Sequence, residues 1–159
     1  MVSNSVELYG VKIDGLNAFP TPEKILTLSE SQIRSEIKCG FRSRYLLNLS
    51  RVAIQRPDIF LSNCWLKLSS YEFYNLLINI LGLGPVSVSY LCRIYGKPIG
   101  FAVDSYVKKR CLDLWGVASD IESFAKKRYK LFGDLAPYVL WFEITKHWHT
   151  SNYPFDIIL

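Results

Sequence analysis

The sequence contains little of what most metal sites require. The 159-residue chain has only four cysteines and two histidines, and no two cysteines form a C-x-x-C pair. This spacing indicates neither a zinc site nor an iron–sulfur cluster, so we predict no cofactor and no bound metal. Cys39, Cys64, Cys92 and Cys111 each lie in an apolar or helical context. They are typical of reduced thiols in a protein core.

Long hydrophobic runs are also absent. No stretch reaches the roughly 18 uninterrupted apolar residues of a membrane span, and no charged-then-apolar leader opens the chain. We find no internal repeat, low-complexity segment or flexible linker. The sequence therefore predicts a soluble intracellular protein with no membrane partner, folded as a single domain over residues 1–159.

The residues that are abundant are apolar and basic. Hydrophobic residues make up 50% of the chain, the mean hydropathy is +0.13, and the net charge is +5 with a pI near 9.0. The apolar excess leaves room for an exposed face that binds a partner. The positive charge suits a polyanion, and basic residues follow one another at Lys108, Lys109 and Arg110.

Local start and stop signals divide the chain into short helices. Ser29 and Ser69 each open a capping box, while Pro22 and Pro85 stand at first helical positions. Only residues 99–103 resemble a strand, and residues 1–18 are weakly patterned. We therefore predict an all-α fold. Its helices are expected at about 22–28, 30–40, 42–55, 70–80, 85–95, 105–116, 120–131 and 135–148.

The first feature that carries chemistry is a helical hairpin over residues 72–95, which turns through Leu81-Gly82-Leu83-Gly84. Glycines allow a sharp turn and a close approach of phosphate to the main chain. The following helix adds unpaired N–H groups and the positive end of its dipole. The same residues also fit a plain helix–helix turn with a glycine cap, and the pattern alone does not separate the two interpretations.

The second feature is Asp104, which follows Gly84 by twenty residues and precedes a basic helix. A helix N-terminus and nearby cations keep a carboxylate ionised. A fixed anion there can stabilise the oxocarbenium-like sugar of a breaking glycosidic bond. The alternative is that Asp104 only caps its helix.

Together these features resemble a known family. The run LINILGLGPVSVSYLCRIYGKPIGFAVDSYVKKR is similar to the helix-hairpin-helix–Gly/Pro–Asp superfamily of DNA glycosylases. The upstream run AFPTPEKILTLSESQIRSEIKCGFRSRYLLNLSRVAI resembles its 8-oxoguanine and alkyladenine branches, and Gly-Phe-Arg-x-Arg-Tyr at 40–45 is especially like the 8-oxoguanine branch. The final run FAKKRYKLFGDLAPYVLWFEITKHWH resembles the closing helices. The resemblance extends from about residue 8 to 149.

The resemblance implies a base-excision-repair enzyme with a helical glycosylase fold. Such an enzyme binds double-stranded DNA and flips a damaged base out of the duplex. The implied phosphate contacts are the amides of Gly82, Gly84 and Ser87, together with Tyr106 and Lys108. The family's catalytic aspartate corresponds to Asp104.

Two positions depart from the family pattern. Bifunctional members carry a nucleophilic lysine two residues after the second hairpin glycine, where this chain has Val86. The resemblance therefore favours hydrolysis, with Asp104 orienting water, over lyase chemistry. In the base pocket, Trp141 and Tyr90 would stack on the base, but Pro137 replaces the family's polar reader. Two aromatic walls without a polar reader predict a stacking pocket, suited to an electron-poor alkylated purine.

The family also has a segment before this region, whereas this chain begins almost directly with the second portion. We therefore expect a fold that is incomplete at its N-terminus, completed by a second subunit or by self-association, or else a truncated protein. Two other functions stay open: a non-catalytic hairpin module that binds DNA, and a glycosylase/lyase that uses a lysine from elsewhere. The sequence does not identify the lesion.

Overall fold

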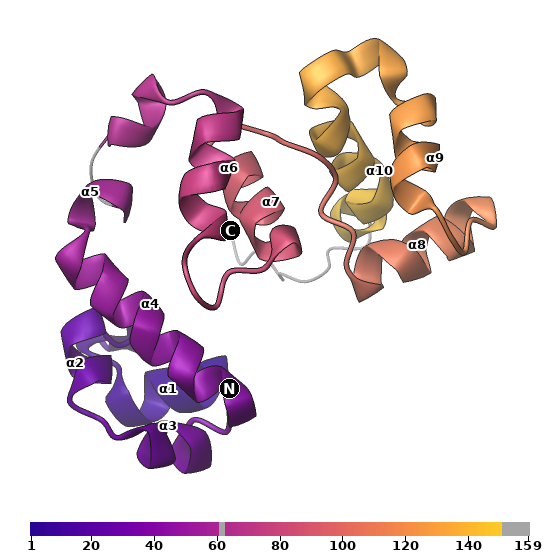
Figure 1. The fold of residues 1–159 in the computed structure, drawn as a ribbon. Helices are drawn as coiled ribbons and strands as arrows, with labels where there is room; N and C mark the ends of the chain where they lie inside the picture. The colour runs from indigo at the N-terminus through magenta and orange to yellow at the C-terminus, as the bar shows by residue number, and fades with distance from the viewer. Residues whose placement is uncertain (61–62, 151–159) are drawn as a thin grey trace. The chain divides into compact units, whose positions relative to one another are not determined.

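The computed structural model describes residues 1–60 and 63–150, and only the backbone of Asn63, Cys64 and His149. The chain divides into two compact units, which are described separately (Figure 1). Unit 1 comprises residues 1–67 and 78–83. Unit 2 comprises residues 68–77 and those from 84 onward. Both units are helical, so the all-α prediction is confirmed. Among the described residues, no helix is long and apolar enough to span a membrane.

Unit 1 packs short helices around the longer α4. Its buried core contains Ile25, Ile33, Ile37, Cys39 and Leu47, which bring α2, α3 and α4 together. This core is small, and side-chain caps at Thr21 and Ser29 help to fix where α2 and α3 begin. The elements are α1 (Val2–Tyr9), β1 (Lys12–Ile13), β2 (Leu16–Asn17), α2 (Pro22–Leu26), α3 (Glu30–Glu36), η1 (Gly40–Arg42), α4 (Ser43–Gln55), α5 (Pro57–Phe60) and η2 (Asn63–Lys67).

The short hairpin of β1 and β2 was not predicted. It turns through Asp14 and Gly15, which have φ angles of 49° and 82°. Positive φ at both central residues is the conformation that Asp-Gly favours in a two-residue hairpin, so this dipeptide was the available signal. The strand considered at residues 99–103 is absent, and that segment is irregular. Gly100 has a positive φ there, which interrupts an extended strand, so the all-α prediction holds for this segment.

Unit 2 packs α8, α9 and α10 around a second core. Its buried members include Val107, Cys111, Ala125, Leu140 and Ile144. These residues recur at helical spacing, so each helix buries one face against the others. The elements are α6 (Ser70–Ile78, whose last residue belongs to unit 1), α7 (Pro85–Ile94), α8 (Ser105–Trp115), α9 (Ile121–Arg128), η3 (Lys130–Leu135) and α10 (Ala136–Thr150).

The predicted helix starts agree with the structure. Both capping boxes form: the Ser29 amide donates to Gln32 at 2.9 Å, and the Ser69 amide donates to Glu72 at 2.8 Å. The helix expected to end at Gly40 instead ends at Glu36, because Lys38 adopts a φ of 58° that an α-helix excludes.

The cysteine prediction also holds where it can be examined. Cys39, Cys92 and Cys111 are free and buried. Burial raises the pKa of the Cys92 thiol to about 11, which keeps it protonated and unreactive at neutral pH. The side chain of Cys64 lies outside the described residues.

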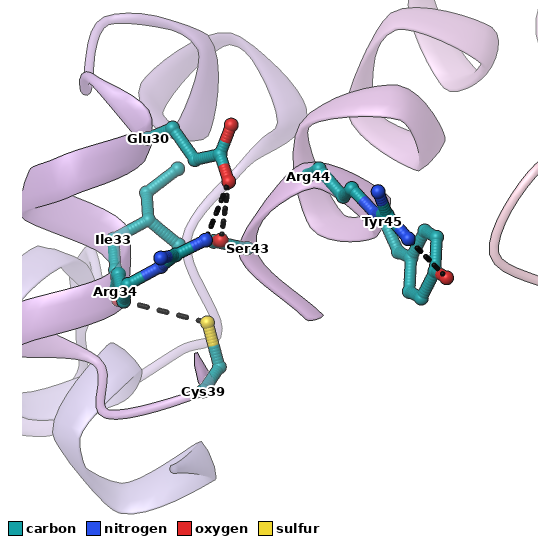
Figure 2. Close-up of polar contacts among 7 residues, drawn as sticks. All are labelled: Glu30, Ile33, Arg34, Cys39, Ser43, Arg44 and Tyr45. Atoms are coloured by element: carbon teal, nitrogen blue, oxygen red, sulfur yellow. Dashed lines mark hydrogen bonds and ion pairs between the residues drawn. The ribbon is translucent and has the colours of Figure 1, made fainter. Parts of the chain in front are cut away.

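A polar network fixes the turn between α3 and α4 (Figure 2). The Glu30 carboxylate accepts hydrogen bonds from Arg34 at 3.2 Å and from the buried Ser43 at 3.0 Å. The Cys39 thiol donates to the Ile33 carbonyl at 3.6 Å. These contacts set where α4 starts, and therefore where Tyr45 stands on its first turn.

From that position α4 holds the turn after α6. The Asn48 amide donates to the Leu81 carbonyl at 2.9 Å. Gly82 has a φ of +105°, and a Cβ added there would lie 2.7 Å from the Cβ of Tyr45. Gly82 is therefore required twice, by its backbone angle and by the close approach of α4. Gly84 differs, since its φ is −88° and no atom lies within 4 Å of an added Cβ.

We predict that Gly82→Ala destabilises the protein by about 1–3 kcal/mol, because the methyl group overlaps Tyr45 and strains the backbone. Gly84→Ala is the matched control and should cost less, about 0.5 kcal/mol, because alanine is only a poorer N-cap there and meets no neighbouring atom. Chemical denaturation of both variants measures the difference. Equal losses of unfolding free energy would contradict this account of the turn.

Candidate active site

The start of α7 exposes backbone donors. Gly84 is its N-cap and Pro85 its first residue, and no side chain caps the helix. Gly84, Pro85, Val86 and Ser87 are all exposed. The Val88 amide bonds to the Gly84 carbonyl at 2.9 Å, which closes the first turn. The N–H groups before it point out of the helix end, where the helix dipole favours an anion.

Asp104 is the N-cap of α8, as predicted. Its Oδ1 accepts a hydrogen bond from the Val107 amide at 2.8 Å, and its Oδ2 accepts one from the Tyr90 hydroxyl at 2.9 Å. The carboxylate is half-buried. It thus links the start of α8 to α7, and the two bonds fix the orientation of both carboxylate oxygens. Capping and a fixed catalytic orientation are compatible uses of the same group.

Tyr90 lies beside Asp104, and the structure brings these two predicted site residues together. Burial raises the pKa of Tyr90 to about 12, and the hydrogen bond to Asp104 acts in the same direction. The phenol therefore stays protonated and donates to the carboxylate at any physiological pH. The sequence had assigned Tyr90 only to the base pocket, so its bond to Asp104 is a second role.

Trp141 completes an aromatic cluster around the predicted base pocket. Its ring lies 5.8 Å from that of Tyr90, at an interplanar angle of 85°. The Tyr106 ring also belongs to this cluster, with its centre 6.3 Å from that of Trp141 and 5.6 Å from that of Trp148. The Tyr106 hydroxyl oxygen is buried, so a contact between it and a phosphate requires the ring to turn.

The sequence missed one member of this cluster, Arg93. Its guanidinium carbon lies 4.7 Å from the centre of the Tyr90 ring and 4.4 Å from that of Trp141. Its spacing from Tyr90, three residues along α7, was the signal that could have found it, since such pairs share a helix face. Pro137 offers no polar side chain, as expected, but Arg93 supplies a polar group to the predicted base pocket.

Val86 lies on a separate cavity of about 570 Å³ within unit 2. Lys108 lines the same cavity, whereas Asp104, Tyr90 and Trp141 do not. Lys97, in the segment between α7 and α8, is a second lysine near this part of the sequence. Its ammonium donates to the Leu68 carbonyl, a structural contact within unit 2. Lys108 therefore shares a cavity with Val86, the position at which the resemblance predicts a nucleophilic lysine.

The raised pKa of Tyr90 predicts how stability responds to alkaline pH. An unfolded tyrosine loses its proton near pH 10, whereas folded Tyr90 keeps it to about pH 12. Between these values the folded state binds more protons than the unfolded state, so its stability falls as pH rises. Denaturation of wild type and Tyr90→Phe across this range should show a steeper loss in wild type. Parallel curves would contradict the assignment.

Comparison with known proteins identifies the fold. No family model matches the chain, and no curated protein matches its sequence. Three solved structures do match. MBOgg1, in complex with a low-affinity DNA ligand, is 22% identical with a TM-score of 0.66, covering 90% of this chain and 50% of its own.

The other two are of the Clostridium acetobutylicum 8-oxoguanine glycosylase/lyase. Its complex with double-stranded DNA containing cytosine opposite 8-oxoguanine is 23% identical with a TM-score of 0.65, covering 95% of this chain and 53% of its own. Its apo form is 25% identical with a TM-score of 0.62, covering 90% and 52%. The chain spans about half the length of these proteins. Over that half, it has the helical fold of the 8-oxoguanine DNA glycosylases, as its motifs predicted.

Proposed function

We propose that this protein is a DNA glycosylase, or the catalytic subunit of one, which flips a damaged base out of double-stranded DNA and hydrolyses its N-glycosidic bond. The observation that carries the proposal is the Asp104 carboxylate, fixed by Val107 and Tyr90 next to the aromatic pair of Tyr90 and Trp141. The fold shared with 8-oxoguanine glycosylases supports it.

The proposed grip on DNA uses the main chain around the start of α7. A phosphate would be held by the amides of Gly82, Gly84 and Ser87, and the exposed Lys108 would add a cation on the following helix. Because these contacts involve only phosphate, they position the duplex without reading sequence. Tyr106 belongs to this set only after its ring has turned.

In the proposed chemistry, Asp104 acts at the sugar. As the C1′–N bond breaks, the base leaves with the bonding electron pair, and the positive charge that develops on the sugar is stabilised by the carboxylate. A water molecule then bonds to C1′, and its proton passes to Asp104. The hydrogen bonds from Val107 and Tyr90 hold the carboxylate without neutralising it.

A covalent route needs an amine that Val86 does not supply. Valine has no nucleophilic atom, so strand cleavage through a Schiff base would require another lysine. Lys108 is the candidate within the same cavity. We therefore propose a hydrolytic enzyme, and retain a lysine-dependent lyase as an outcome that the trapping experiment below detects.

A second portion of protein is part of this proposal. Large apolar side chains are exposed on both units, including Leu131 at 98%, Leu16 at 76% and Ile94 at 74%. Where such side chains gather into a contiguous patch, they mark a surface that a partner covers. We propose that another subunit or a second copy covers it. Activity should therefore be measured on the chain alone and on any complex that co-purifies, with sedimentation of each.

We predict that Asp104→Asn lowers base release by at least about 100-fold, because it removes the negative charge at the sugar. Asparagine is an equally good N-cap, and its amide can bond both Val107 and Tyr90, so folding should be preserved. Single-turnover assays on duplexes bearing 8-oxoguanine, hypoxanthine, 3-methyladenine or uracil measure the effect.

This experiment also separates the enzyme from a non-catalytic module. A module would bind an abasic duplex and release no base from any substrate, in wild type as in the variant. Unchanged base release in Asp104→Asn would remove this residue from the mechanism.

We predict that the wild type forms no covalent adduct with an abasic duplex under borohydride, and that Val86→Lys gains one. Val86 is 37% exposed, so a lysine is accommodated there. Gel separation of the trapped complex measures both proteins. A wild-type adduct that disappears in Lys108→Gln would assign lyase activity to Lys108 and refute the hydrolytic assignment.

A further inference from the structure

The predicted base pocket is closed by Arg93. Two aromatic walls that sandwich a base must stand about 7 Å apart, since each stacked contact takes about 3.5 Å. The rings of Tyr90 and Trp141 are instead nearly perpendicular, with centres 5.8 Å apart. The Arg93 guanidinium lies over both, at 4.7 and 4.4 Å. A planar cation thus fills the corner in which a flipped base would stack.

The backbone of this arginine is tied to α10, and its guanidinium contacts Tyr90 both through a side-chain hydrogen bond and over the ring. The Tyr138 hydroxyl donates to the Arg93 carbonyl at 2.7 Å, which ties α10 to this point of α7. Within residues 1–60 and 63–150, no carboxylate lies within ion-pair distance of the guanidinium. Asp104 is the acid whose charge reaches it, but its two oxygens already accept from Val107 and Tyr90.

The guanidinium keeps its charge in this setting. Burial lowers the pKa of Arg93, while the neighbouring Tyr90, Tyr138 and Asp104 oppose that change. An arginine remains protonated in proteins at neutral pH, with its N–H donors arranged in a planar fork. The pocket therefore presents a fixed positive charge and several donors, and no acceptor from this side chain.

We propose that Arg93 selects the base. It closes the empty pocket by lying over the rings of Tyr90 and Trp141, and when a base enters, its side chain changes rotamer and turns its N–H edge to the base's oxygen and nitrogen acceptors. The inference rests on the proposed function and adds a specificity-determining residue to it. Neutral bases that carry carbonyl oxygens satisfy the fork, as guanine satisfies arginine in DNA grooves. Cationic alkylated purines place like charge against it.

This assignment reverses the base class that two aromatic walls alone predicted. A pocket of Tyr90 and Trp141 without a polar reader would favour an electron-poor, positively charged purine through its π faces. With Arg93 over both faces, the same rings already hold a cation. A second cation in contact with it is repelled.

The test measures binding to duplexes that the enzyme cannot cleave. The probes carry a 2′-fluorinated nucleotide with either neutral 8-oxoguanine or cationic 7-methylguanine, and reference duplexes carry guanine or a stable abasic analogue. We expect wild type to bind the neutral lesion at least about tenfold more tightly than the cationic one, relative to the abasic reference. Arg93→Met, which keeps length and removes charge, should abolish that ratio and leave abasic binding within about twofold.

Two further variants sharpen the test. Arg93→Lys keeps the charge and loses the planar fork, so it should still reject the cationic base while losing its preference for the neutral one. Arg42→Met is the matched control, because Arg42 also lies over an aromatic ring, 4.9 Å from the centre of Phe41, and belongs to unit 1, whereas Arg93 and Asp104 belong to unit 2. It should change the affinities for all probes in equal proportion. Circular dichroism establishes that each variant is folded.

The outcomes are distinguishable. An unchanged neutral-to-cationic ratio in Arg93→Met, with lesion binding intact, overturns the role of Arg93 and leaves the glycosylase proposal standing. Failure of wild type to prefer any lesion or the abasic reference over guanine refutes both. A ratio that also collapses in Arg42→Met would show that net charge, and not the pocket, sets the discrimination.

Discussion

The Asp104 carboxylate is the contact around which the candidate site is built. One oxygen receives the Val107 amide and starts α8, while the other receives the Tyr90 hydroxyl from α7. Without this group, the first turn of α8 would lack its cap and Tyr90 would lack its acceptor. The position of the pocket's first wall is therefore coupled to the orientation of the acid that would act on the sugar.

This coupling has a chemical consequence. A carboxylate that only caps a helix needs one accepting oxygen, whereas this one has both oxygens fixed by donors from different helices. Tyr90 can serve as that donor because burial and Asp104 together raise its pKa to about 12, far above the range in which it would ionise. Burial of the Tyr90 phenol thus keeps it protonated as a donor, and this donor fixes the orientation of the Asp104 carboxylate. Electrostatic stabilisation of a transition state requires such a fixed orientation.

The hairpin and the pocket rely on different kinds of contact. In unit 1, the turn after α6 is set by steric fit, since the main chain at Gly82 approaches Tyr45 too closely for any side chain. In unit 2, the pocket is set by stacking, with Arg93 in place over two rings. Steric fit restricts the backbone to one conformation, whereas Arg93 is held by ring contacts and a hydrogen bond to Tyr90, and not by an ion pair among the described residues. The turn after α6 is therefore fixed by its backbone, whereas the proposed base pocket is fixed by contacts between side chains.

The sequence by itself determined the local features. Capping residues at Ser29, Ser69 and Asp104 fixed helix starts, because a side chain reaches only the nearest amides, and the hairpin glycines with Asp104 indicated the fold that the solved glycosylases share. The dipeptide Asp14-Gly15 likewise encodes the turn between β1 and β2. Tertiary structure alone decided that Tyr90 donates to Asp104, that the Tyr106 hydroxyl is covered, and that Arg93 stacks on Trp141. Those contacts join residues 14 to 48 positions apart in the chain or depend on how rings pack, and spacing along a sequence does not encode either.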